Sequence, residues 1–461
     1  MLAQSAIQFN ARYVWTISAV AALGGLLFGY DFVVIGGAKP FYESFFRLES
    51  QQLIGWANSC ALLGCLLGSL ISGAASDYFG RKKLLISSAI IFAVSSLLTG
   101  WAESFNAFVL WRITGGVAIG IASNISPIYI AEVSPAEWRG RMVSLNQLTI
   151  VIGILAAQIV NWTIARPVEP GATAEMIRLS WNGQFAWRWM FTAVAVPSLV
   201  FLFGALFVPE SPRWQVGNRK RDAANRTLTR IGGSAYAERA VREIEETIAT
   251  EGSAEWRQLL SPVVMKIVGL GVFLAVLQQW SGINVIFNYA EEIYKSAGYG
   301  ISDTMFNIVI TGAINLVFTL AAFGFVDRLG RRKLMLAGCA GIGVSHVLLG
   351  GAYYLGLKGL PVLVFTLAVM ACFALTLGPV TWVLISEIFP NRVRGAAVSI
   401  AVSALWIACF ILTYTFPLLN HALGSAQTFW LYAGICFVGF IVVLWKVQET
   451  KGKTLEEIES M

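Results

Sequence analysis

The sequence predicts an all-α membrane protein whose twelve transmembrane helices form two six-helix bundles, joined by a short cytoplasmic helical insert. The first observation is composition: of 461 residues, 57% are hydrophobic and 13% are charged, about half the charge of an ordinary soluble protein. The second is a set of twelve continuous apolar stretches, since about 20 residues suffice for one bilayer crossing. The third is that loop motifs of the first half recur in the second. A soluble enzyme, a nucleic-acid-binding protein and an alternating transmembrane β-barrel are excluded.

The expected spans follow the apolar stretches along the chain. They cover residues 13–38, 53–75, 84–102, 107–130, 142–164, 189–208, 267–290, 304–326, 334–357, 362–386, 395–419 and 427–445. Between the sixth and seventh spans the chain is rich in Arg, Glu and Ala, and residues 219–249 are expected to form short amphipathic helices. We therefore divide the chain into an N-terminal bundle (1–209), a cytoplasmic helical linker (210–260), a C-terminal bundle (261–447) and a cytoplasmic tail (448–461).

The placement of positive charge predicts the orientation. The net charge is +7, and 25 of the 33 Lys and Arg residues fall on the side of the two termini, whereas 7 fall on the opposite side. Because Lys and Arg accumulate in cytoplasmic loops, both termini are expected inside the cell. Topology thus explains the excess charge without a nucleic-acid partner. The expected partner is the lipid bilayer, the expected state is a monomer, and the short termini favour a prokaryotic inner (cytoplasmic) membrane.

The sequence gives no sign of a metal centre or of catalysis. The cysteines all lie in apolar spans and are expected to be small packing residues: Cys60, Cys65, Cys339, Cys372, Cys409 and Cys436. No loop carries a cysteine pair of metal-ligand spacing, and no nucleophile–base set or phosphate loop is evident. His346, alone on an apolar stretch, is expected to pack. We expect no cofactor and no enzyme activity.

Acids, glycines and arginines recur at the inner ends of equivalent spans. The motifs of the first half and their equivalents in the second are Asp77-Tyr-Phe-Gly-Arg81 and Asp327-Arg-Leu-Gly-Arg331, Glu132 and Glu387, Arg139 and Arg394 and, more faintly, Glu210-Ser-Pro-Arg213 and Glu449-Thr-Lys451. One copy alone would be an ordinary positively charged turn. Repetition at equivalent loops predicts a duplicated six-helix unit, with a substrate site near the midplane between the repeats.

Six motifs together carry a family resemblance. They are Asp77-Tyr-Phe-Gly-Arg-Lys82, Pro209-Glu-Ser-Pro-Arg-Trp214, Gln278-Gln-Trp-Ser-Gly-Ile-Asn284, Gly378-Pro-Val-Thr-Trp382, Glu387-Ile-Phe-Pro-Asn-Arg-Val-Arg-Gly395 and Glu449-Thr-Lys-Gly-Lys-Thr-Leu-Glu456. With them the chain resembles, over essentially its whole length, the sugar porter family of the major facilitator superfamily, and it is most similar to bacterial sugar–proton symporters such as the xylose transporter. The resemblance implies the major facilitator fold and the import of a monosaccharide.

Asp31 and Arg112 are the strongly ionisable side chains deep inside the expected spans. Burying either alone would cost at least about 3 kcal/mol, so each needs a partner or a function. Asp31 would load and release the coupling proton as it moves toward and away from Arg112, and a static ion pair is the alternative. The resemblance favours coupling, because proton-coupled members carry the Asp and facilitative members carry a neutral residue. Some relatives have a further acid where this chain has Val194.

Side-chain amides suit a sugar, because they donate and accept hydrogen bonds without carrying a charge. The resemblance implies a central sugar site formed by Phe28, Gln147, Gln278, Gln279, Asn284, Asn315, Trp382 and the gating Tyr289. A lone amide in a span more often bonds a neighbouring helix, so the close set of Gln278, Gln279 and Asn284 carries this interpretation. Two positions depart from the family pattern, since Asn288 stands where Tyr or Phe is usual and Leu405 where an amide is usual. Both are expected to alter which sugar is accepted.

Alternating access requires gates at the two ends of the pathway. We expect ion pairs among the repeated loop residues to hold the inner gate shut, namely Asp77, Arg81, Glu132, Arg139, Glu210, Arg213, Asp327, Arg331, Glu387 and Arg394. Two other functions remain open. In a facilitative uniporter Asp31 would be structural, and a membrane sugar sensor would bind the sugar without transporting it.

Overall fold

The computed structural model describes residues 8–169, 171–250, 261–389 and 393–451, and the regular elements of these residues are helices. Twelve segments are long and apolar enough to cross a membrane, and each overlaps one expected span. The N-terminal six are α1 (Ala11–Phe46), α2 (Gln51–Phe79), α3 (Arg81–Gly100), α4 (Phe105–Val133), α5 (Arg139–Ile164) and a composite crossing made of a π-helical turn (Asn182–Ala186), α7 (Trp187–Thr192) and α8 (Ala195–Phe207).

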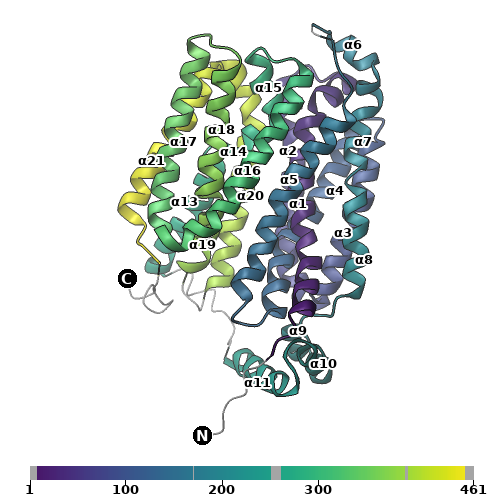
Figure 1. The fold of residues 1–461 in the computed structure, drawn as a ribbon, viewed down its shortest axis with the longest axis vertical. Coiled ribbons are helices and arrows are strands. Elements are labelled where there is room, and N and C mark those ends of the chain that lie inside the picture. Colours follow the sequence, from purple (N-terminus) through teal and green to yellow (C-terminus); the bar gives the residue numbers. More distant parts are fainter. Residues whose placement is uncertain (1–7, 170, 251–260, 390–392, 452–461) are drawn as a thin grey trace.

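The C-terminal six include two crossings that are broken into consecutive helices. They are α13 (Pro262–Trp280) with α14 (Ile283–Asn288), α16 (Ile301–Leu329), α17 (Arg331–Tyr354), α18 (Leu360–Leu375) with α19 (Leu377–Glu387), α20 (Arg394–Leu423) and α21 (Ser425–Lys446). The short helices α6 (Ala174–Leu179) and α15 (Ala290–Ser296) lie at the upper end of the bundle in Figure 1. The prediction of an all-α fold with twelve spans is confirmed.

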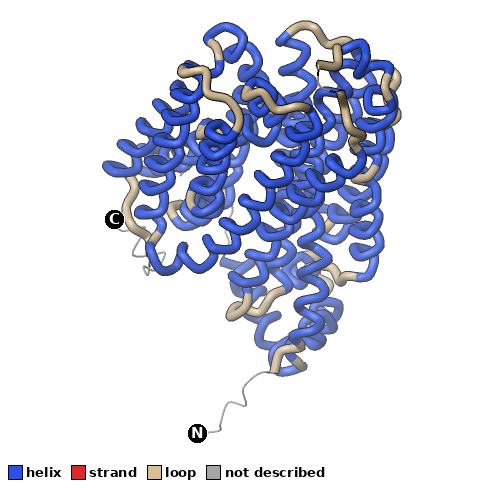
Figure 2. Tube along the Cα trace, turned by 45° about the horizontal axis from the view of Figure 1, so that its top comes forward, coloured by secondary structure: helices blue, strands red, loops and turns tan. Residues whose placement is uncertain are grey.

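The two halves form two adjoining bundles (Figures 1 and 2). Within the first half α2 packs on α4 and α1 on α5, and within the second α17 packs on α21 and α13 on α20. The halves meet where α2 packs on α20 and α5 on α16. Small residues permit close approach in such bundles: a Cβ added to Gly64 or Gly68 of α2 would overlap the α4 backbone.

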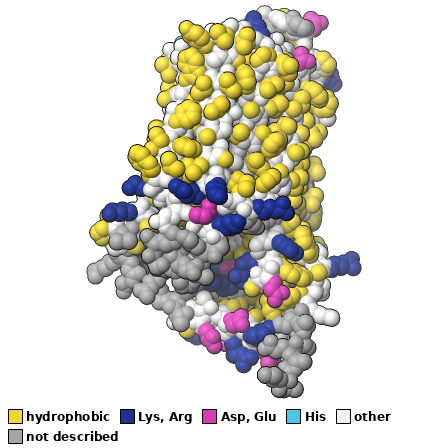
Figure 3. All heavy atoms as spheres, turned by 60° about the vertical axis from the view of Figure 1, so that its left-hand side comes forward, with side chains coloured by type: hydrophobic (Ala, Val, Ile, Leu, Met, Phe, Trp, Pro, Cys, Tyr) yellow, Lys and Arg dark blue, Asp and Glu magenta, His cyan; other side chains and the backbone are white. Residues whose placement is uncertain are grey.

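The side of the bundle that would face lipid is covered by apolar side chains, with a row of Lys and Arg near its lower edge (Figure 3). In lipid every backbone polar group must be satisfied within the protein, and helices meet that demand. Serine side chains cap the starts of three of these helices. Each serine hydroxyl accepts a hydrogen bond, at 3.2–3.4 Å, from the backbone N–H three positions later: Ser50 for α2, Ser104 for α4 and Ser261 for α13. The chain is a multi-pass membrane protein.

The insert between the halves forms α9 (Pro212–Gly217), α10 (Arg221–Gly232) and α11 (Ser234–Thr250) at the lower end of Figure 1. The α10 helix buries Ala224, Leu228 and Ile231, so the expected amphipathic helices are present. The segment before α1 joins this layer, because the N–H of Asn10 donates to the carbonyl of Ile231 at 2.8 Å.

Candidate functional site

Two broken helices meet in the C-terminal half. Between α13 and α14, Gly282 takes a left-handed conformation (φ 86°), and an added Cβ would lie 2.9 Å from Nε2 of His346. The same His346 nitrogen lies 2.8 Å from the carbonyl of Ser281, so the histidine packs against this break as the sequence suggested. Between α18 and α19 the break falls at Thr376. Broken helices expose backbone groups to a pathway at membrane depth.

The amides of Gln278, Gln279 and Asn284 form one hydrogen-bonded chain beside these breaks. Gln278 donates from Nε2 to the carbonyls of Leu377 and Gly378, at 3.2 and 3.0 Å. Gln279 donates to Oε1 of Gln278 at 3.1 Å, and Asn284 donates to Oε1 of Gln279 at 2.5 Å. All three side chains are buried. The chain therefore fixes the three amides relative to each other and to the α18–α19 break.

The other proposed sugar-contacting residues come from four further helices. Asn315 of α16 is buried, Gln147 of α5 is half-buried, and Trp382 of α19 is 39% exposed. Phe28 of α1 packs on Trp406 of α20, with ring centroids 5.8 Å apart. Phe28 and Trp406 thus join the two halves of the protein.

Tyr289 and its neighbours lie where α14 gives way to α15. The hydroxyl of Tyr289 donates to the carbonyl of Thr413 at 2.6 Å, and its ring lies 4.7 Å from that of Phe416. Asn288 is buried, and its Oδ1 has no hydrogen-bond partner among the described residues. In the same way, the buried Trp406 has an indole Nε1 that makes no such bond within the described part of the chain. Unsatisfied buried polar atoms of this kind are groups that a polar ligand can satisfy.

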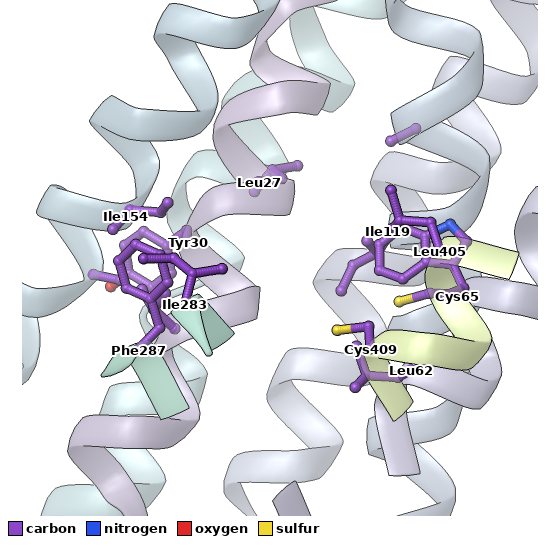
Figure 4. Close-up of a cluster of buried hydrophobic side chains, with 14 of the residues drawn as sticks. Leu27, Tyr30, Leu62, Cys65, Ile119, Ile154, Ile283, Phe287, Leu405 and Cys409 are labelled. Atoms are coloured by element: carbon purple, nitrogen blue, oxygen red, sulfur yellow. The ribbon is translucent and has the colours of Figure 1, made fainter. Parts of the chain in front are cut away.

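Apolar side chains of the two halves pack together in two groups. In Figure 4 Tyr30 of α1 and Ile154 of α5 lie against Ile283 and Phe287 of α14. A second group in the same view brings Leu405 of α20 into a cluster with α2 and α4. Leu405 is buried here, so the residue that replaces an amide contributes apolar surface between the halves.

Asp31 and Arg112 form a buried ion pair within the N-terminal half. Nη1 of Arg112 lies 2.9 Å from both carboxylate oxygens of Asp31, and the guanidinium lies 5.2 Å from the ring centre of Phe191. Both charged side chains are at most 5% exposed. The pairing expected from their depth in the spans is present.

The inner loops repeat one hydrogen-bonding pattern in each half. Glu210 accepts the N–H groups of Arg81 and Lys82 at the start of α3, and Glu449 accepts those of Arg331 and Arg332 at the start of α17. Gly80 and Gly330 precede these helices with φ of 93° and 91°, and a Cβ on either would strike the glutamate. The motif repeat inferred from the sequence is therefore accompanied by the same hydrogen bonds in the two halves.

Two ion pairs at the inner loops each join residues of the same half. Arg81 lies 3.0 Å from Glu132, and Arg331 lies 3.3 Å from Glu387. Hydroxyls complete each site, from Ser211 to Glu132 at 2.5 Å and from Thr450 to Glu387 at 2.6 Å. The remaining gate residues are placed as follows: Asp77 pairs with Arg81 at 3.3 Å, Arg213 lies in α9, Arg139 is exposed, and the side chains of Asp327 and Arg394 are outside the described set.

The sequence interpretation missed the buried charge of Lys39. The α1 helix runs eight residues beyond its expected end at 38, through Pro40, to Phe46. Lys39 is consequently inside a helix and 2% exposed, and its Nζ lies 2.6 Å from Glu292 of α15. Lys39 and Pro40 directly follow the apolar stretch 13–38, and proline often marks a helix end. The spacing of Lys39 and Glu43 at i and i+4 is the signal that could have found it.

Comparisons with known proteins agree with this architecture. Residues 17–461 match the family model described as "Sugar (and other) transporter". The D-xylose-proton symporter of Escherichia coli K12 is 37% identical over 486 residues, covering 98% of this chain and 96% of that protein. The glucose transport protein of Synechocystis is 39% identical, with 97% of each chain covered.

A solved structure agrees over almost the same length. The E. coli xylose transporter XylE, in a partially occluded inward open conformation, superposes with a TM-score of 0.85 at 34% identity, covering 96% of this chain and 100% of that one. Matches of this length and identity fix the family. The chain belongs to the sugar porter family of the major facilitator superfamily.

Proposed function

We propose that this protein is a sugar–proton symporter that imports a monosaccharide across the cytoplasmic membrane by alternating access. The observation that carries the proposal is the buried pair of Asp31 and Arg112, at 2.9 Å. A carboxylate in a span is costly unless it has a partner and a use. Gaining a proton would release Asp31 from Arg112, and losing it would restore the pair, so the pair can respond to the proton gradient.

The sugar site lies, in this proposal, beside the broken helices of the C-terminal half. The chain of Gln278, Gln279 and Asn284 supplies donors and acceptors in fixed directions. Trp382, 39% exposed, can offer its ring to the apolar face of a sugar. The relatives named above act on xylose and glucose, so a pentose or hexose is the expected substrate class. Asn288 and Leu405 are then the positions that set the preference.

The proposed cycle alternates contacts between the two ends of the bundle. Three tight contacts join the halves away from the inner loops: α1 meets α14 at Gly36, α2 meets α20 at Gly55, and α5 meets α16 at Gly312. At the inner loops Glu132 and Glu387 pair within their own halves. Contacts between the halves at one end, together with ion pairs inside each half at the other end, suit a state in which the sugar leaves toward the cytoplasm. In this proposal both termini lie on the cytoplasmic side, and the protein acts as a monomer.

The test is transport by the purified protein in proteoliposomes. A panel of labelled pentoses, hexoses, deoxysugars and inositols is offered with and without an inward proton gradient. Symport requires that one sugar class accumulates above its outside concentration only when the gradient is present, and that the same sugar drives proton uptake. Uptake that never exceeds equilibrium would identify a facilitative uniporter, and saturable binding without uptake would identify a sensor.

A further inference from the structure

We propose that Lys39 is the central residue of an ionic latch that closes the outer end of the sugar pathway by exchanging carboxylate partners. It contacts two carboxylates across the interface between the halves, Glu292 at 2.6 Å and Glu291 at 3.5 Å, both on α15. It also contacts Glu43 of its own helix at 3.2 Å. One lysine that is 2% exposed thus joins the first helix of the N-terminal half to the C-terminal half.

The local packing explains why the latch can form only when the halves are close. One turn before Lys39, Gly36 lies against the backbone of Phe287 and Asn288, and an added Cβ would overlap the Phe287 carbonyl. A glycine is therefore needed for α1 to approach α14 so closely. Any separation of α1 from α14 and α15 would carry Lys39 away from Glu292.

Each side of the latch has a partner of its own for the open state. On α1, Glu43 stays beside Lys39 because the two are separated by one helical turn. On α15, Glu291 lies 3.7 Å from Lys295, again at i and i+4. A buried charge left without a partner is strongly unfavourable. The two resident pairs keep Lys39 and Glu291 partnered after the cross-half pair with Glu292 breaks, so the outer end can open.

The position of the latch connects it to the sugar pathway. The ammonium of Lys39 lies 5.7 Å from the ring centre of Tyr289, the residue that follows Asn288. Glu292 also lines a cavity of about 400 Å³ together with Ile54 of α2 and Asn420 of α20. The latch therefore contacts both this cavity and Tyr289. The inference rests on the proposed function only in treating this end of the bundle as the outer one.

The reporter of opening is a cysteine at Ile54, which is buried on α2 and lines the cavity. Ile54→Cys protein in lipid nanodiscs is labelled with a hydrophilic maleimide, without sugar or a proton gradient. The parent chain, with its native cysteines buried or half-buried, supplies the background rate. Because the readout needs no transport, failure of the latch and failure of the symport proposal are separate results.

The partner exchange predicts effects of opposite sign. Glu292→Gln removes the cross-half partner and should speed labelling about tenfold, the effect of one charge-assisted hydrogen bond on an equilibrium. Glu43→Gln removes the partner needed in the open state and should slow labelling. Lys39→Gln, which removes the central charge, should speed labelling and serves as the second variant if Glu43→Gln does not fold.

A matched control carries an ion pair at the same end of the molecule but within one helix. Glu175 pairs with Arg178 inside α6. Ile54→Cys protein that also carries Glu175→Gln should therefore be labelled at the same rate as Ile54→Cys alone. Faster labelling of both Glu292→Gln and Lys39→Gln, with slower labelling of Glu43→Gln, supports the latch. An unchanged rate in Glu292→Gln or Lys39→Gln, or a Glu43→Gln rate that is unchanged or faster, would overturn it, because a cluster that only stabilises the fold gives no opposite signs.

Discussion

Arg112 holds Asp31 with a single nitrogen, Nη1, placed 2.9 Å from both carboxylate oxygens. The guanidinium Nε is buried and makes no hydrogen bond among the described residues. A two-ended Arg–carboxylate fork would bind more strongly and more rigidly. The observed geometry attaches the carboxylate through one nitrogen only, and this suits the detachment of Asp31 that the proposed transport cycle requires.

Asp31→Asn should abolish accumulation driven by a proton gradient while leaving sugar exchange between equal concentrations. The amide cannot take up and release a proton, yet it occupies the same volume beside Arg112. Accumulation and counterflow are measured in the same proteoliposomes, with Glu175→Gln as the control of equal chemistry at an exposed pair. Loss of both activities, or of neither, would count against the coupling role.

Gly80→Ala and Gly330→Ala should each destabilise the protein by about 1–3 kcal/mol, because their backbone conformations are almost exclusive to glycine. The new Cβ would also displace Glu210 or Glu449 from the helix start that it caps. Thermal unfolding in detergent measures the loss. Gly140→Ala is the control, since no heavy atom lies within 4 Å of its added Cβ. Equal stability of Gly80→Ala and the control would refute the repeated cap.

Glu387→Gln should increase access to the pathway from the inner side. Glu387 accepts from Arg331 and Thr450 within its own half, and the exposed Arg139 of the other half is its proposed partner in the state with the inner end closed. The neutral amide would hold that closed state less well. Labelling of Gln147→Cys from the cytoplasmic side is the measurement, and Glu238→Gln on the exposed face of α11 is the control. Unchanged labelling would argue against this gate.

Gln279→Ala should weaken sugar binding about tenfold, because Gln279 links Gln278 to Asn284 and its loss leaves buried amide atoms without partners. Equilibrium binding of the transported sugar to purified protein measures the change. An affinity within twofold of the unmodified protein would place the sugar elsewhere.

Leu405→Gln should change the ranking of sugars, since it restores a hydrogen-bonding side chain next to Trp406. Leu405→Met keeps the volume without the amide and should preserve the ranking. Uptake of the panel of labelled sugars in proteoliposomes, described above, measures both variants. A common ranking in all three proteins would show that position 405 does not select the substrate.

Contacts between residues that lie far apart in the sequence could be predicted only in part. The pair of Asp31 and Arg112 was accessible because two isolated charges inside apolar spans must find partners. The contacts of Lys39 with Glu291 and Glu292 were not, because they bridge more than 250 positions and the helix end was drawn before Lys39. Gln278, Gln279 and Asn284 were expected to act together, but their bonding order depends on the direction of two broken helices.

The sequence by itself determined twelve spans, the duplication and the family, because these follow from the length of apolar runs and from motifs repeated along the chain. Only the tertiary structure decided which charges meet. It placed Glu132 and Glu387 within their own halves and brought α15 against α1, since ion pairing depends on distances between helices that no local pattern specifies. The partners of Lys39 are among the contacts that only the tertiary structure decided.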